Sequence, residues 1–300
     1  MRLDDLDPTD NARDLGSGGG GFGGGGGFPL FGLLFALFGR RLGCGGILLI
    51  GAVLLVFSMM NNGNFGGIED RSGGAGTEQS STEGSGKGVC NTPERLEACR
   101  VMKSTEITWG EIFRQQGKTY QPATINFFEG GVNTGCGSAS SAVGPFYCPG
   151  DNGVYLDTEF FAELDKRFGA KGDFARAYVV AHEIGHHIQD LLGTSEQVST
   201  MQRRGSEEQG NAWSVRLELQ ADCYAGVWAY HNRDRIEPGD IEEGLTAANA
   251  IGDDTLQEQA QGHVSPEKFT HGTSAQRVKW LRVGLESGDP AKCDTMTGAI

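Results

Sequence analysis

The residues best suited to chemistry lie in the segment His182-Glu183-Ile184-Gly185-His186, which has the spacing H-E-x-x-H. Residues four apart lie on the same face of a helix, so both imidazoles can bind one zinc ion. Glu183, between them, can take a proton from a water molecule that the metal activates. Residues 178–181 are largely apolar, which favours a partly buried helix over two histidines on a solvated face. The spacing predicts zinc as cofactor, His182 and His186 as ligands, and Glu183 as general base.

A catalytic zinc site needs a third protein ligand, and the residues directly after His186 contain no extended H-E-x-x-H-x-x-G-x-x-H motif. The best candidate is Glu218, on a later helix. Asp222 lies one turn after Glu218, where it could accept the free N–H of a ligating imidazole. Their neighbours are mostly apolar, and a buried carboxylate requires a partner. We therefore expect zinc to be held by His182, His186 and Glu218, with Asp222 supporting a ligand.

The elements that must position these residues are mainly helical. Apolar periodicity and capping residues predict helices over residues 158–168, 173–192, 206–231, 239–251 and 274–286. Apolar stretches and a turn predict short strands and a hairpin at residues 123–128, 146–148 and 154–156. The expected fold class is α+β, helix-rich with a small sheet. H-E-x-x-H falls in the second of these helices and the two carboxylates fall in the third.

The chain before the globular part has a different composition, with about half of the 49 glycines in the first 89 residues. The glycine-rich composition of residues 1–41 predicts a disordered cytoplasmic head. Residues 42–60 carry no charge and are long enough for one transmembrane helix. We expect residues 61–89 to form a flexible linker and residues 90–300 to form the metallopeptidase domain.

The basic residues set the expected orientation of this span. Arg40 and Arg41 precede it directly, and no Lys or Arg follows until Arg71. The positive-inside rule then leaves the N-terminus in the cytoplasm and residues 61–300 outside, in a periplasm or at a cell surface. A cleaved signal peptide is the alternative, but no small-x-small cleavage site follows the apolar run. We expect a single-pass membrane protein with an extracytoplasmic domain.

The cysteines favour the same compartment. Apart from Cys44, six remain, an even number without a C-x-x-C pair: Cys90, Cys99, Cys136, Cys148, Cys223 and Cys293. This pattern favours three disulfides in an oxidising compartment over free buried thiols. Six cysteines allow fifteen pairings. If the nearest neighbours pair, Cys90 joins Cys99 and Cys136 joins Cys148, which leaves Cys223 for Cys293.

Several segments in combination resemble one known family. They are Gly-Pro-Phe-Tyr-Cys-Pro at 144–149, Val-Tyr-Leu-Asp at 154–157, His-Glu-Ile-Gly-His-His at 182–187, Leu-Gln-Ala-Asp-Cys-Tyr-Ala-Gly-Val-Trp at 219–228 and His-Gly-Thr-Ser-Ala-Gln-Arg at 271–277. The chain resembles the bacterial neutral zinc metallopeptidases of the YpfJ type over roughly residues 90–295, together with the head and span. The resemblance implies a membrane-anchored, zincin-like domain of gluzincin character, with Glu218 as third ligand and Asp222 beside it. It implies no particular substrate.

Weaker candidates surround this set. His271 and Arg277 could stabilise a developing oxyanion or bind the substrate backbone, and a helix cap with a surface salt bridge is an equal alternative. We include His271 among the candidate catalytic residues. His187 is expected to be packed or to support a ligand. Tyr147 and Tyr224 could donate to an oxyanion, although buried core tyrosines are commoner.

Two functions remain open from the sequence. The first is a membrane-anchored zinc peptidase that acts on a peptide or protein substrate. The second is a non-proteolytic, zinc-stabilised binding or assembly module of the cell envelope. Glu183 favours the enzyme, because a purely structural zinc site does not need it. The net charge of −14 argues against nucleic acid as a partner.

Overall fold

The computed structural model describes residues 1–17 and 84–300, and a five-stranded mixed sheet organises the first half of this part. The strand order is β2-β1-β3-β7-β6, with bounds β1 Ala12–Ser17, β2 Gly84–Ser85, β3 Thr124–Glu129, β6 Phe146–Cys148 and β7 Gly153–Leu156. The three inner strands β1, β3 and β7 are parallel, whereas β2 and β6 run antiparallel to their neighbours. The sheet is therefore mixed, with an antiparallel strand at each edge.

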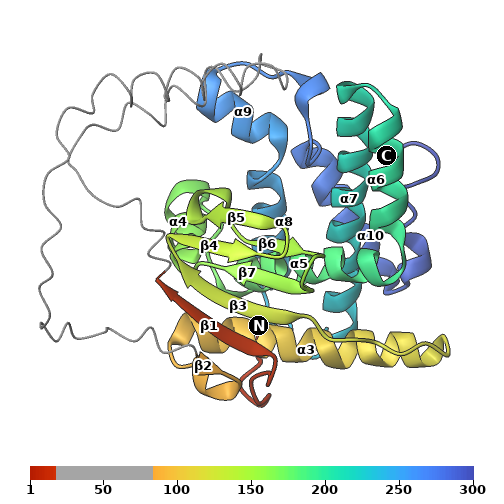
Figure 1. Ribbon diagram of the computed structural model, residues 1–300. Helices are drawn as coiled ribbons and strands as arrows, with labels where there is room; N and C mark the ends of the chain where they lie inside the picture. The colour runs from red at the N-terminus through yellow and green to blue at the C-terminus, as the bar shows by residue number, and fades with distance from the viewer. Residues whose placement is uncertain (18–83) are drawn as a thin grey trace, which may run out of the picture. The chain divides into compact units, whose positions relative to one another are not determined.

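Eight α-helices lie in the described residues. Their bounds are α3 Pro93–Gln115, α4 Glu159–Phe168, α5 Asp173–Leu191, α6 Thr194–Arg204, α7 Glu207–His231, α8 Asp240–Ala250, α9 Asp253–Gln261 and α10 Ser274–Ser287. Helix α5 is buried along most of its length because it packs between α3, α7, α8 and strands β6 and β7. Figure 1 shows α6, α7 and α10 grouped beyond one end of the sheet. The fold is helix-rich α+β, as expected.

The elements predicted from the sequence are present with shifts of one or two residues at their ends. The helix around the H-E-x-x-H segment is α5, and the helix around Glu218 is α7, which begins with a capping box between Ser206 and Gln209. Sequence reasoning missed α3, α6 and α9, strands β1 and β2, and a small hairpin of β4 Gly131–Thr134 and β5 Gly137–Ser140.

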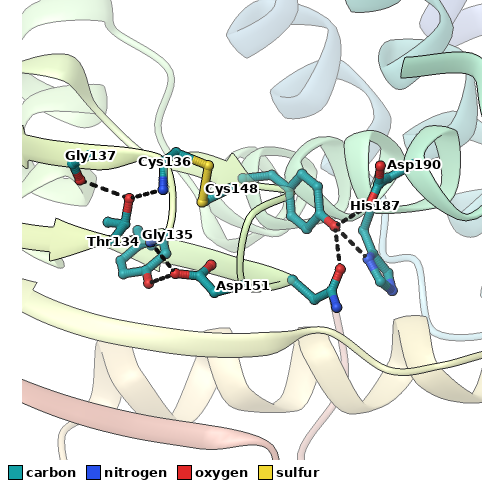
Figure 2. The surroundings of a disulfide bond; sticks show 11 residues. Thr134, Gly135, Cys136, Gly137, Cys148, Asp151, His187 and Asp190 are labelled. Carbon is teal, nitrogen blue, oxygen red and sulfur yellow. Dashed lines mark hydrogen bonds between the residues drawn. A yellow bond between two sulfur atoms is a disulfide. The ribbon is translucent and has the colours of Figure 1, made fainter. Parts of the chain in front are cut away.

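The three expected disulfides are all formed: Cys90–Cys99, Cys136–Cys148 and Cys223–Cys293. The second ties the β4–β5 hairpin to strand β6, as Figure 2 shows. There the backbones of Gly135 and Gly150 touch, since a Cβ on Gly135 would lie 2.8 Å from the Gly150 carbonyl carbon. The third joins α7 to the C-terminal segment.

The expectation of a disordered head over residues 1–41 was wrong for residues 1–17. Ala12–Ser17 forms strand β1, parallel to β3, and Leu3 and Ala12 are buried in the core. The linker expected over residues 61–89 also ends earlier, because Gly84–Ser85 forms β2 and Val89 is buried. These segments are ordered because their few apolar side chains find core positions and their polar backbone joins the sheet.

The predicted span at residues 42–60 and Cys44 lie outside the described residues. Within residues 1–17 and 84–300, no helix combines the length and the apolar composition needed to cross a bilayer.

Helices α7 and α10 approach each other through two glycines. A Cβ on Gly284 would lie 2.7 Å from the backbone nitrogen of Val227, and one on Gly226 would lie 2.7 Å from that of Leu285. Neither obstacle is a flexible side chain, so added atoms could be accommodated only by moving a helix.

Gly284→Ala should therefore destabilise the protein. The clash should cost about 1–3 kcal/mol and outweigh the gain of about 1 kcal/mol in helix propensity. The matched control is Gly110→Ala in α3, where a Cβ meets nothing within 4 Å, and it should be neutral or stabilising. Chemical unfolding of the purified variants measures both effects. Equal stability of the two variants would contradict the close approach.

Candidate metal centre

Three donor groups from two helices converge on one point. His182 and His186 come from α5 and Glu218 comes from α7, and one donor atom of each lies within 4.8 Å of the others. The Nε2 atoms of His182 and His186 lie 3.2 Å and 3.4 Å from the two carboxylate oxygens of Glu218. Zinc ligands at about 2.0–2.1 Å in a tetrahedron are about 3.3 Å apart. The three side chains therefore fit a zinc ion.

Gly185 allows the two helices to come this close. A Cβ on Gly185 would lie 2.8 Å from the carbonyl oxygen of Ala221 and 2.9 Å from its Cα. Gly185 lies between the two histidines of the motif, and Ala221 lies one turn after Glu218. The contact of backbone on backbone thus brings the third donor to the histidine pair.

His182 is held by a fully buried carboxylate. Its Nδ1 lies 2.8 Å from Oδ1 of Asp222, so Nδ1–H donates to Asp222, and Nε2 is the nitrogen that a metal would bind in place of a proton. Burial disfavours the imidazolium, but the charge and hydrogen bond of Asp222 outweigh it and raise the pKa of His182 to about 10. The environment therefore favours a positive charge at this position.

Asp222 is itself held by a buried cation. The Nε and one terminal nitrogen of Arg277, from α10, donate to its two oxygens at 2.9 and 2.8 Å, and the Tyr178 hydroxyl donates at 2.6 Å. Arg277 is 2% exposed. The surface salt bridge considered for Arg277 from the sequence is therefore wrong, because its partner is a buried carboxylate at the centre of the site.

His186 is held by a neutral group. Its Nδ1 lies 2.9 Å from Oε1 of Gln189, whose amide donates to the carbonyl of Leu217 and to Oε1 of Gln220. Gln220 in turn donates to the carbonyl of Cys293 at 2.9 Å. A chain of hydrogen bonds thus runs from His186 to the C-terminal segment that the Cys223–Cys293 disulfide fixes on α7.

The three donors open into a cavity of about 680 Å³. Glu183 lines it beside the two histidines but does not belong to the three-residue donor group. Much of the remaining wall is apolar. It is formed by residues of β6, α4, α5, α6, α7 and α9 and of the chain just before β6 and just after α8: Pro145, Phe146, Phe160, Val179, Val198, Leu217, Ile251 and Leu256. Glu183 thus faces a space in which a substrate could lie.

His271 also lines this cavity, where a catalytic residue would have to lie. Its Nδ1 lies 3.1 Å from Oδ1 of Asp253, and the other oxygen of Asp253 accepts from the backbone N–H groups of residues 270–272. The hydrogen bond to Asp253 raises the pKa of His271 above its ordinary value. Sequence reasoning missed Asp253, because nothing in the local pattern links it to His271.

The remaining candidates have structural partners. His187 is buried, with Nε2 2.6 Å from the carbonyl of Gln121 and Nδ1 3.0 Å from the Tyr147 hydroxyl, which agrees with a packed residue. The Tyr147 hydroxyl also donates toward Asp190, and the interactions of His187 and Asp190 are drawn in Figure 2. Tyr224 is buried edge-to-face against Trp109 and does not line the cavity.

The donor set, its supports and the adjoining cavity define a candidate zinc-binding protein. A family model described as "Putative neutral zinc metallopeptidase" matches residues 1–296. The Escherichia coli K12 protein that carries the name "Uncharacterized protein YpfJ" is 50% identical over 202 residues, 67% of this chain and 70% of the relative. A protein of Mycobacterium tuberculosis H37Rv is 45% identical over 222 residues, 68% of this chain and 72% of the relative. The chain belongs to this neutral zinc metallopeptidase family, and no solved structure matches it.

Asp222→Ala should lower the free energy of unfolding by about 3–5 kcal/mol, because it leaves Arg277 buried without its partner. The double variant Asp222→Ala/Arg277→Met should recover part of that loss. Unfolding of the purified protein in a chelator measures stability apart from metal binding.

Glu111→Ala is the control, since Glu111 and Arg114 form an exposed ion pair in α3, and exposed pairs contribute little to stability. A loss no larger for Asp222→Ala than for Glu111→Ala would contradict the role assigned to the buried pair.

Proposed function

We propose that this chain is a zinc-dependent peptidase that hydrolyses peptide bonds. The observation that carries the proposal is the position of Glu183, beside the donor group of His182, His186 and Glu218 and on the wall of the same cavity. A closed structural zinc site uses four protein ligands and needs no free carboxylate next to them. The non-proteolytic envelope module is the less favoured reading for that reason.

The residues of the site divide the chemistry between them. Zinc, when bound, supplies a Lewis acid that polarises the scissile carbonyl and lowers the pKa of water. Glu183 takes the proton from the attacking water and passes it to the leaving amine. Asp222 and Gln189 accept hydrogen bonds from Nδ1–H of the two histidines, so that both Nε2 atoms would be available to hold the metal. His271, whose pKa the hydrogen bond to Asp253 raises, donates to the oxygen that gains negative charge.

Strand β6 supports a peptide as the substrate class. It is the edge strand next to β7, and residues 144–147 line the cavity. An extended peptide can add to such an edge through main-chain hydrogen bonds while its side chains enter adjacent pockets. The mixed sheet with an antiparallel edge beside the metal helix also supports a zincin-like fold, of gluzincin character because the third donor is a glutamate.

The compartment is proposed from the disulfides. Three bridges are formed within residues 90–293, and such bridges persist in oxidising environments. We place the site domain outside the cytoplasm. Membrane attachment rests on residues 42–60, which lie outside the described residues, and stays a prediction from the sequence.

Glu183→Gln should keep close to one zinc per chain and slow hydrolysis by about 10²–10⁴-fold, the usual contribution of general acid–base catalysis. The control Glu163→Gln changes another cavity-lining glutamate, which lies on α4 and does not belong to the donor group, and it should act within about twofold of the parent. Elemental analysis and cleavage of a fluorescein-labelled unstructured protein, with and without chelator, measure the two properties.

Two results would overturn this assignment. Loss of zinc in Glu183→Gln would make Glu183 a ligand, and unchanged cleavage would remove it as the base. Retention of zinc after His182→Ala with His186→Ala would overturn the metal site itself.

The pH profile tests His271. Because Asp253 raises the pKa of His271, the imidazolium persists to higher pH than usual. Asp253→Asn removes the carboxylate charge and should lower that pKa, so activity should fall at a lower pH on the alkaline side. His271→Ala should lower kcat with little change in KM.

The exposed His263 provides the control, since its ring is hydrogen-bonded to the carbonyl of Gln261 in its own turn and it does not line the cavity. His263→Ala should leave the profile unchanged. An alkaline limb at the same pH in Asp253→Asn and in the parent would exclude His271 as the donor.

A further inference from the structure

Strand β1 is an interior strand. Both strands next to it, β2 and β3, come after residues 18–83 in the sequence. Asp14 pairs with Phe127 of β3 in parallel and with Gly84 of β2 in antiparallel fashion. Neighbouring strands lie about 4.8 Å apart. Residues 18–83 therefore leave the domain at the end of β1 and rejoin it at the adjacent strand β2.

Side-chain and backbone hydrogen bonds also join the first 17 residues to helix α3. Arg95 of α3 donates to both oxygens of Asp14 at 2.6 and 3.4 Å. The backbone N–H of Thr9 donates to the carbonyl of Cys99 at 3.2 Å, and the Thr9 hydroxyl donates to Glu106. Thr9 is fully buried by these contacts. A strand that is hydrogen-bonded on both sides and tied to α3 through Arg95 belongs to the folded domain.

A bilayer cannot separate groups in such contact, because its hydrocarbon core alone is about 30 Å thick. We infer that residues 1–17 and 84–300 lie on the same side of the membrane, so that residues 18–83 begin and end on one face. This inference differs from the orientation predicted from the sequence, which places residues 1–41 in the cytoplasm and residues 61–300 outside.

A shared side changes the expected number of membrane crossings. A segment whose two ends lie on one face cannot cross the bilayer only once, so the single pass predicted from residues 42–60 is incompatible with it. The other apolar stretch, residues 28–38, has eleven residues, fewer than the roughly 20 that a helix needs to cross. The disulfides support an extracytoplasmic domain, as proposed above. The inference that both segments share one side does not depend on that placement.

Single cysteines in the full-length protein test the inference. In a Cys44→Ser background every other native cysteine is in a disulfide, so Asp10→Cys and Gln259→Cys each add one free, exposed thiol. Spheroplasts are treated with a membrane-impermeant maleimide before and after lysis. We expect both variants to be labelled equally before lysis. Labelling of only one of them before lysis would overturn the inference.

If both thiols react only after lysis, the shared side holds and the extracytoplasmic placement fails. A second pair tests the strand contact itself. Arg13→Cys with Ser85→Cys places thiols on directly paired, exposed residues, whose Cα separation suits a disulfide. Mild oxidation should cross-link this pair, and the control pair Arg13→Cys with Gln259→Cys should stay reduced. Absence of the cross-link would overturn the inference even with equal labelling.

Discussion

The close crossing of α5 and α7 is the constraint on which the site depends. A single cation can be bound by three side chains only if their donor atoms lie within a few ångströms, and here they come from two helices. Gly185 and Ala221 meet backbone to backbone at the crossing. Much of the surrounding structure holds α7 in that position. Helix α10 packs on it through Gly226 and Gly284, and the C-terminal segment is joined to it by the Cys223–Cys293 disulfide.

The buried charges of the site follow from the same crossing. Helix α7 brings two carboxylates, Glu218 and Asp222, toward two histidines, and α10 brings one guanidinium, Arg277, that pairs with Asp222. With neutral imidazoles these groups leave one negative charge in a largely buried site, and the proposed base Glu183 adds a second beside it. A divalent ion bound by the three donors would balance these charges and could polarise a carbonyl group. The hydrogen-bond partners of the two histidines differ in charge, since His182 is bonded to the carboxylate of Asp222 and His186 to the neutral amide of Gln189.

The sheet links the site to the rest of the chain. Its edge strand β6 lines the cavity, and the Cys136–Cys148 disulfide fixes that strand to the neighbouring hairpin. At its other side lie the edge strand β2 and its neighbour β1, between which residues 18–83 lie in the sequence. The same sheet therefore positions one wall of the cavity and decides where the intervening segment leaves and rejoins the domain.

The sequence by itself determined what depends on one element or on near neighbours. Helical periodicity placed His182, Glu183 and His186 on one helix, and Glu218 with Asp222 on another, because spacing within a helix fixes which side chains share a face. Tertiary structure decided which faces meet. Arg277 reaches Asp222, and Asp253 holds His271, across separate elements. Gln189 of α5 and Gln220 of α7 together connect His186 to the carbonyl of Cys293. Strand β1 was missed for a related reason: its residues are mostly polar, and only its pairing with β2 and β3 makes it a strand. Local patterns record which surface a segment buries, but the partner that covers it is chosen by packing between segments far apart in the chain.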